Sequence, residues 1–488
     1  MNAPLSSNGD CSFDQARTLV ELLDCAVLGE YKVDYSSWPP RMDHALLLIM
    51  VYRSVATPKE LLVHVADRSD SAPFSDAAIA KFLILWMDQA PQDFVDSECY
   101  SMLNGLLQAL QRNPALEPAI TLAQRLLRLP AQDFDTTYSG ISTISAEVPR
   151  ESRTVSSRSS ELTIPMKNRK NHSSLNIIFD YMEQDDRSDS PSDSSETELY
   201  FPPSYSHSSW ASEHSADSSA SFLSVEEKHQ FYLESLLKCP PHLIASEIVR
   251  LDWDLFSKVR LRDYVRFAFT SFSRFKGYPE AFEAYTNVAK FCNFMSDWTS
   301  TALTNAPESL RPSVLSLLVK VVGFLYHWGD FNSLFPMTIG LQKYIDRNPD
   351  DWQRLIDPDS SCSDLELSVE LLEEDLEIFE RCRDKVIRTG NRFEHYQDEI
   401  RSRMWSGKQY IPLWGPFASL LILAKDGNDS FVGEEQRINW PKFILIGSYL
   451  NVARIALERP YFVAYTPEAF RVIRTVQHMS DNPLQEDT

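Results

Sequence analysis

A segment rich in Ser, Asp, Glu and Pro divides this sequence into two parts. It covers residues 131–225 and contains the stretch SDSPSDSSETELYFPPSYSHSSWASEHSADSSASF. Such a composition buries too little apolar surface to offset the conformational entropy that ordering would cost. The sequence therefore predicts a disordered linker, which restricts folded structure to a smaller N-terminal flank and a larger C-terminal flank.

The two flanks are long enough to bury hydrophobic cores, because the chain has 488 residues, of which 43% are hydrophobic. That length indicates roughly two or three domains. The chain carries 47 Lys and Arg against 69 Asp and Glu, which gives a formal net charge of −22. A surface of that sign repels phosphate backbones, so we expect no nucleic-acid partner.

The cysteine usage and the chain ends indicate a compartment. The seven cysteines are odd in number and include no C-x-x-C pair, which is typical of a reduced, intracellular protein. The N-terminus MNAPLSSNGD lacks the basic and apolar regions of a signal peptide, and the longest apolar stretches are short or interrupted by Lys320. We expect a cytoplasmic protein without direct membrane insertion, recruited to membranes only through its partners.

Helical patterns occur on both flanks of the predicted linker. In TPKELLVHVADR, Thr57 can cap a helix, Pro58 suits its first turn and Glu60 completes a capping box. Other stretches carry apolar residues three and four positions apart, among them AIAKFLILWMDQ and RPSVLSLLVKVVGFLYHW. No alternating strand pattern and no internal repeat stand out, so the sequence predicts an all-α protein.

One C-terminal stretch gives an especially clear helical prediction. In INWPKFILIGSYLNVARIAL, Asn439 is placed to cap a helix and Pro441 falls in its first turn. Four apolar residues at helical spacing then share one face and predict its buried side: Phe443, Ile446, Leu450 and Ala453.

The motifs of common catalytic and cofactor sites are absent. The sequence has no G-x-x-x-x-G-K-[ST], no G-x-G-x-x-G, no H-E-x-x-H and no G-x-S-x-G. The ten histidines are scattered, and paired acids such as Glu373 and Glu374 are typical of a solvated helix face. We therefore expect no cofactor, no metal and no enzyme chemistry that makes or breaks bonds.

Several C-terminal segments together resemble the catalytic domain of the Ras-family guanine-nucleotide exchange factors. The stretches HLIASEIVRLDWDLFSKVRLRDYV, FLYHWGDFNSLFPMTIGLQ, GNRFEHYQDEI, YIPLWGPFASLLILAKDGND and INWPKF occur in the family's order and spacing. The resemblance implies a helical catalytic domain with a protruding helical hairpin. It also implies a Ras-family small GTPase as partner, whose bound nucleotide is released without any bond being made or broken.

The N-terminal flank is similar to the exchanger-motif domain that usually precedes this catalytic domain. The match depends on the Thr-Pro-x-Glu-Leu-Leu stretch that begins at Thr57 and on the segment from Trp86 to Asp93 and Phe94. The resemblance implies that this domain buttresses the hairpin. The expected organisation is an N-terminal segment 1–30, an exchanger-motif domain 31–130, the linker 131–225, a catalytic domain 226–478 and a tail 479–488.

The resemblance assigns roles to particular residues of the hairpin, whose helices are expected at about 416–425 and 441–458. Ile422 and Asp426 match the family's hydrophobic and acidic wedge residues, and their spacing of four puts both on one helix face. Ile422 would place apolar bulk where the metal belongs, and Asp426 would place negative charge near the phosphates. Asn332 and Tyr396 would brace the hairpin or touch the GTPase. The other residues expected to contact the GTPase are Asp330, Ser419, Leu420, Gly427 and Asn428.

The sequence also departs from the family. Gly329 and Asp330 replace an asparagine pair, Leu420 replaces a polar residue, and Asp426 is one methylene shorter than the usual glutamate. Taken alone, apolar residues that end in Asp-Gly are typical of an ordinary helix terminus, and it is the flanking matches that favour the hairpin. The alternative function is a catalytically inactive helical scaffold that binds a small GTPase or another signalling partner.

Overall fold

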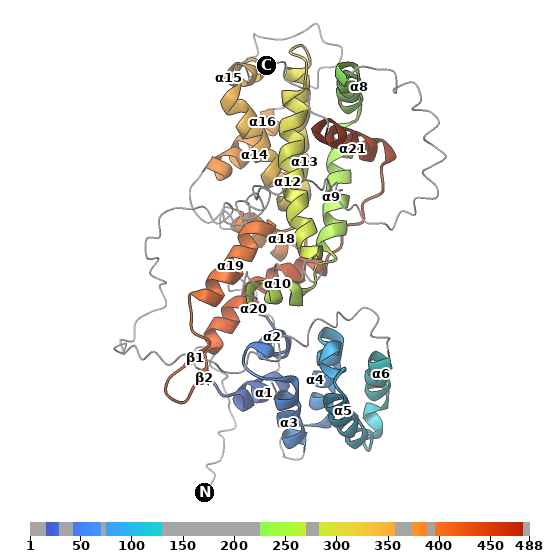
Figure 1. The fold of residues 1–488 in the computed structure, drawn as a ribbon, viewed down its shortest axis with the longest axis vertical. Helices are drawn as coiled ribbons and strands as arrows, with labels where there is room; N and C mark the ends of the chain where they lie inside the picture. Colours follow the sequence, from blue (N-terminus) through green and yellow to red (C-terminus); the bar gives the residue numbers. More distant parts are fainter. Residues whose placement is uncertain are drawn as a thin grey trace, which may run out of the picture. The chain divides into compact units, whose positions relative to one another are not determined.

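The computed structural model describes residues 16–28, 42–69, 75–128, 225–269, 283–356, 373–387 and 396–481. The predicted linker 131–225 lies outside the described residues except for Val225, where a helix begins. Apart from one two-stranded sheet, the regular elements of the described residues are helices, which confirms the prediction of an all-α fold (Figure 1). None of the described helices is both long and apolar enough to cross a membrane.

The chain forms two compact units. The described residues of the first unit fall within 16–128, 268–269 and 422–448, and those of the second within 225–267, 283–421 and 449–481. The N-terminal helices of the first unit are α1 (Leu19–Leu28), α2 (His44–Val51), α3 (Pro58–Ser69), α4 (Asp76–Gln89), α5 (Ser97–Leu110) and α6 (Glu117–Arg128), with 3₁₀ turns η1 (Tyr52–Ser54), η2 (Pro91–Phe94) and η3 (Pro114–Leu116).

The capping box predicted at the start of α3 is confirmed. The Thr57 hydroxyl accepts a hydrogen bond from the Glu60 amide at 3.2 Å, and the Glu60 carboxylate accepts one from the Thr57 amide at 2.7 Å. Each side chain thus satisfies a backbone donor that the first helical turn leaves unpaired. The hydrogen bond from the Thr57 amide lowers the pKa of Glu60, because it favours the charged carboxylate.

A buried carboxylate organises the N-terminal helices. Asp93, in η2, is 2% exposed and accepts a hydrogen bond from the Trp86 indole nitrogen of α4 at 2.7 Å. The Tyr52 hydroxyl and the Arg53 guanidinium also donate to this carboxylate. Because a buried charge is tolerated only when it is paired, Asp93 ties η1, α4 and η2 together. The segment from Trp86 to Phe94, on which the resemblance rests, is therefore a structural centre of the first unit.

The second unit is a helical domain. Its helices are α8 (Val225–Lys238), α9 (Pro241–Phe256), α10 (Leu261–Phe269, with its last two residues in the first unit), α12 (Glu283–Thr304), α13 (Arg311–Trp328), α14 (Phe331–Arg347), α15 (Pro349–Ile356), α16 (Glu373–Ile387), α18 (Gln397–Trp405) and α21 (Pro467–Asp481). Within it, α12 packs along α14, and α13 packs against α9. Helix α13 is buried on nearly all sides from Ser313 to Leu325, as an apolar helix at the centre of a domain must be.

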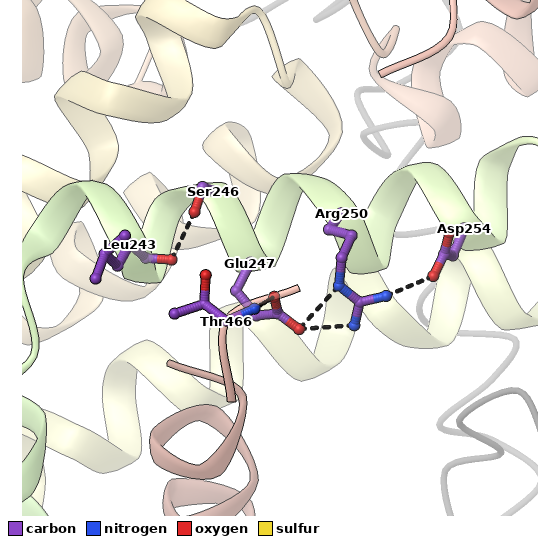
Figure 2. A network of polar contacts seen from close by, with 6 residues as sticks. All are labelled: Leu243, Ser246, Glu247, Arg250, Asp254 and Thr466. Atoms are coloured by element: carbon purple, nitrogen blue, oxygen red, sulfur yellow. Dashed lines mark hydrogen bonds and ion pairs between the residues drawn. The ribbon is translucent and has the colours of Figure 1, made fainter. Parts of the chain in front are cut away.

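An ion-pair network connects α9 to the start of α21 (Figure 2). Glu247 is fully buried and accepts hydrogen bonds from Arg250, whose Nε and Nη2 lie 3.0 and 2.6 Å from its Oε1. Arg250 also donates to Asp254 at 2.8 Å. The other Glu247 oxygen accepts the amide of Thr466, the residue before α21, at 3.2 Å. The network compensates the buried charges and fixes where α21 begins.

Helix α13 ends at a glycine that no larger residue can replace without strain. Gly329 has a φ of +81°, and a Cβ atom there would lie 2.6 Å from the Arg403 guanidinium carbon. Arg403 occupies this space because it caps the helix, donating to the carbonyls of Tyr326, His327 and Trp328 at 2.6–3.1 Å. Burial lowers the pKa of Arg403, and these carbonyls replace the water that its charge loses.

We predict that Gly329→Ala destabilises the second unit more than Gly407→Ala does. Both glycines have positive φ, +81° and +72°, but a Cβ at Gly407 would meet nothing within 4 Å. The left-handed backbone alone costs roughly 1–2 kcal/mol for alanine, and at Gly329 displacement of Arg403 adds to it. Urea unfolding of the full chain measures both losses, and equal losses would contradict the importance of the Arg403 cap.

Candidate functional site

Two long helices and a short tip form the predicted hairpin. Helix α19 (Trp414–Asp426) and helix α20 (Trp440–Leu457) are joined by β1 (Phe431–Val432) and β2 (Arg437–Ile438), which pair antiparallel (Figure 1). The helices begin and end within two residues of the predicted bounds, and the sequence analysis missed only the two short strands. The predicted inner face of α20 is confirmed, since all four of its residues are fully buried: Phe443, Ile446, Leu450 and Ala453.

The outer half of α19 presents one accessible face. Asp426 has a side chain that is 59% exposed, Leu423 is 57% exposed, and Ile422 and Ser419 are half-buried. Their spacing of three, four and seven residues puts them on the same side of the helix. The face is apolar in its middle and acidic at its end.

Leu423 is a member of this face that the sequence analysis missed. It lies four residues after Ser419 and three before Asp426, and this spacing is the signal that could have identified it. By contrast, Leu420, which was expected to contact the partner, is only 9% exposed and lies on the inner side with Leu421 and Ala424.

The tip adds further apolar and acidic surface. Phe431 and Val432 are 38% and 37% exposed. Four carboxylates beside or within the tip are also exposed: Asp426, Asp429, Glu434 and Glu435. Lys425 lies 3.1 Å from the Asp426 carboxylate, so part of that negative charge is compensated at the surface, where such a pair contributes little to stability.

Gly427 and Asn428 end helix α19 and shape the turn. The Gly427 amide donates to the Leu423 carbonyl at 2.8 Å, and a Cβ atom at Gly427 would lie 2.8 Å from that same oxygen. The Asn428 side-chain amide donates to the Ala424 carbonyl at 3.2 Å. Both residues thus satisfy carbonyls that the last helical turn leaves unpaired.

A buried lysine clamps the tip from α20. Lys442 is 5% exposed, and its ammonium group donates to the Asn428 carbonyl at 2.7 Å and to the Ser430 hydroxyl at 3.0 Å. Burial lowers the pKa of Lys442, because the charged form loses hydration. Helix α20 begins after Asn439 as predicted, and the side-chain amide of Asn439 donates across the tip to the Asp429 carbonyl at 2.9 Å.

N-terminal residues of the first unit contact the same tip. Arg17 and Ile438 exchange two backbone hydrogen bonds of 3.0 and 2.8 Å, which extend the β1–β2 pair by one bridge. Glu21 on α1 accepts a hydrogen bond from Arg437 at 3.0 Å, and the His44 ring meets the Trp440 ring edge-on with centroids 5.9 Å apart.

Helices α2 and α20 approach closely. A Cβ atom at Gly447 would lie 2.6 Å from a methyl carbon of Leu47, so the absence of a side chain at Gly447 permits this packing. Together with the contacts at the tip, this packing connects the N-terminal helices to α20 within the first unit.

Three residues that the resemblance assigned to partner contact or bracing lie inside the second unit. Asp330, Asn332 and Tyr396 are fully buried. The Tyr396 ring packs 5.2 Å from the Phe331 ring, and the Lys385 ammonium lies 4.8 Å from its centroid. A side chain without exposed surface cannot touch a partner while the domain is folded. The described residues contain no group of three or more His, Cys, Asp or Glu that could hold a metal ion.

Comparison with known proteins identifies the domain that carries this hairpin. Residues 243–444 match the model of the RasGEF domain, a range that includes α19, the tip and the start of α20. The Ras guanine nucleotide exchange factor M of Dictyostelium discoideum is 22% identical over 236 residues, which are 48% of this chain and 23% of that protein. The chain thus spans about a quarter of that relative's length. Over the matched residues, this chain contains a RasGEF domain.

Proposed function

We propose that this chain is a guanine-nucleotide exchange factor for a Ras-family small GTPase. The observation that supports this most directly is the accessible face of α19, formed by Ser419, Ile422, Leu423 and Asp426 within the residues that match the RasGEF domain. An apolar face of this kind on a monomer is a candidate for contact with another protein.

The proposed mechanism is a conflict between the hairpin and the bound nucleotide. A small GTPase holds its nucleotide through Mg²⁺, phosphate contacts and a mobile switch segment. Ile422 and Leu423 supply apolar bulk that a metal site cannot accommodate, and Asp426 supplies negative charge that phosphates repel in a partly desolvated pocket. Since the hairpin and the nucleotide favour different conformations of the GTPase, each weakens the binding of the other.

Exchange by this mechanism requires a hairpin that keeps its shape before the partner arrives. Flexible segments lose affinity because they must be ordered on binding. The Lys442 clamp and the contacts of Arg17, Glu21 and Leu47 with the tip and α20 support a pre-ordered hairpin. We propose on this basis that residues 31–130 are an exchanger-motif domain that buttresses the hairpin.

The second candidate function is an inactive scaffold that binds a GTPase without releasing its nucleotide. The burial of Leu420, where the family has a polar residue, and the short side chain of Asp426 favour it. The exposed apolar and acidic face of α19 favours exchange instead, because a scaffold has no need of a wedge. For either function we expect a cytoplasmic protein that reaches membranes through its partners.

We predict that Ile422→Ala and Asp426→Ala each slow GDP release at least about tenfold, equivalent to about 1.4 kcal/mol of transition-state stabilisation. The measurement is release of fluorescent GDP from Ras, Rap, Ral and Rho-type GTPases by the full chain. Because both side chains are partly exposed, thermal unfolding should change little.

Matched controls are available for both substitutions. Val95, between η2 and α5, is an apolar residue that is 63% exposed, and Glu374 on α16 is an acid whose side chain is 71% exposed. Val95→Ala and Glu374→Ala should retain the wild-type rate. If both hairpin variants release GDP as fast as the wild type, the wedge assignment is wrong; binding without acceleration of any GTPase supports the scaffold.

We predict that Lys442→Met loosens the tip, because it removes two hydrogen bonds and leaves the Asn428 carbonyl without its charged donor. Hydrogen–deuterium exchange of residues 427–439 should become faster, and GDP release should slow. Lys425→Met is the matched control for deuterium uptake, since the Lys425 ammonium pairs only with the exposed Asp426 carboxylate among the contacts found at the tip. Equal uptake in both variants would show that the clamp does not order the tip.

A further inference from the structure

We propose that Asp252 and Asp330 share a single proton and, through Asn332, position the first turn of the hairpin helix α19. This inference rests on the proposed function and deepens it, because it names residues that hold the hairpin without touching the GTPase. Its test is designed to fail independently of the exchange activity.

The two carboxyl groups lie side by side within the second unit. Both Asp252, on α9, and Asp330, the N-cap of α14, are fully buried. Ser333 bridges them: its hydroxyl donates to Asp252 Oδ2 at 2.7 Å, and its amide donates to Asp330 Oδ1 at 3.0 Å. Asp330 Oδ2 is buried and has no hydrogen-bond partner. Two neighbouring buried carboxyl groups are costly to charge together, so we infer that one of them keeps its proton.

The pattern of donors shows which carboxyl group is protonated. Asp252 accepts from the Ser333 hydroxyl and from the Asn332 amide, whose Nδ2 lies 2.9 and 3.1 Å from its two oxygens. These donors favour a charged Asp252. Asp330 Oδ2, by contrast, accepts no hydrogen bond, and burial together with the neighbouring Asp252 charge raises the pKa of Asp330 well above its usual value. We therefore place the proton on Asp330 Oδ2, the oxygen that accepts no hydrogen bond and lies beside the charged Asp252.

Asn332 transmits this arrangement to the hairpin. Its Nδ2 faces Asp252, which turns its Oδ1 towards the amide of Trp414, the first residue of α19, at 3.1 Å. The amide of a first helical residue has no partner within its own helix, so this side chain serves as a cap supplied from elsewhere in the chain. A neighbouring ladder adds to it, with Phe331 donating to the Ile411 carbonyl at 3.0 Å and Ile411 donating to the Gly329 carbonyl at 3.0 Å.

The other titratable groups that face the pair stay neutral. The Cys292 thiol of α12 lies 3.1 Å from Asn332 Oδ1, and burial raises its pKa well above the usual value. Burial also raises the pKa of Tyr461, to which the Asp252 carboxylate adds and which the Arg403 charge opposes. Burial raises the pKa of Asp252 as well, but that of Asp330 is raised well above its usual value, so Asp330 is the carboxyl group of the pair that keeps its proton to higher pH.

The shared proton has a defined consequence for stability. An unfolded aspartate ionises near pH 3.9, whereas folded Asp330 holds its proton to higher pH. Between these two values the folded chain binds more protons than the unfolded chain, so stability falls as pH rises. An asparagine side chain at position 330 could donate to Asp252 and accept from Ser333, but it does not titrate. The stability of the Asp330→Asn variant should therefore lack this dependence on pH.

The test compares wild type, Asp330→Asn and Asp330→Ala in the full chain. Relative to the Tm of Asp330→Asn, the Tm of the wild type should fall by at least about 4 °C between pH 5 and pH 8. This is the change expected when the folded chain binds one proton more than the unfolded chain in a domain of this size. Hydrogen–deuterium exchange of a peptide covering 411–421 reads the start of α19. Asp330→Ala should accelerate it relative to wild type, and Asp330→Asn should restore protection.

A Tm difference that does not vary with pH would overturn the shared proton. Unchanged deuterium uptake at 411–421 in Asp330→Ala, with a lowered Tm, would show a structural role without positioning of α19. With an active GTPase partner, Asp330→Ala should lower the rate of GDP release at saturating GTPase and Asp330→Asn should recover it. If the wild type accelerates no GTPase, the proposed function fails, but the Tm and deuterium arms still decide this inference.

Discussion

Helix termini leave backbone amides and carbonyls without partners, and where a terminus is buried the rest of the protein must supply them. In the RasGEF domain, side chains from other segments supply these partners at the end of α13 and at the start of α19. Arg403 closes the carbonyl end of α13, and Asn332 closes the amide end of α19. Both caps come from residues distant in sequence, so each one fixes a helix end relative to another part of the same unit.

Buried carboxylates recur as the centres of these contacts, although the chain as a whole is strongly acidic. Asp93, Glu247 and Asp252 are each nearly or fully buried, and each accepts several hydrogen bonds, with at least one donor outside its own helix. A carboxylate has room for about four donors, and in a low-dielectric interior it strongly favours the arrangement that supplies them. The negative charges inside the protein therefore specify the geometry, while those at the hairpin tip remain available to a partner.

Local signals in the sequence predicted local structure well. The Thr57 capping box, the buried face of α20 and the bounds of the hairpin helices all depend on spacing along one helix, which the sequence contains. How deeply a side chain is buried depends on contacts with segments distant in sequence, and the spacing of residues along one helix gives no information about these contacts. For that reason Asp330, Asn332 and Tyr396 were assigned possible partner contact but are buried, and Leu423 was overlooked although it is more exposed than Leu420.

The departure from the family's asparagine pair follows from these distant contacts. Asparagine tolerates a left-handed φ, but at Gly329 its Cβ would occupy the space of the Arg403 cap, so glycine at this position and Arg403 belong together. At the next position, Asp330 can replace an asparagine donor only by keeping its proton. The buried Asp252 carboxylate makes this possible, because a second charge beside it would cost more than protonation does. Two residues before α14 thus support the start of the hairpin. Gly329 has no side chain and leaves room for the Arg403 cap, and Asp330 keeps its proton and can therefore donate a hydrogen bond.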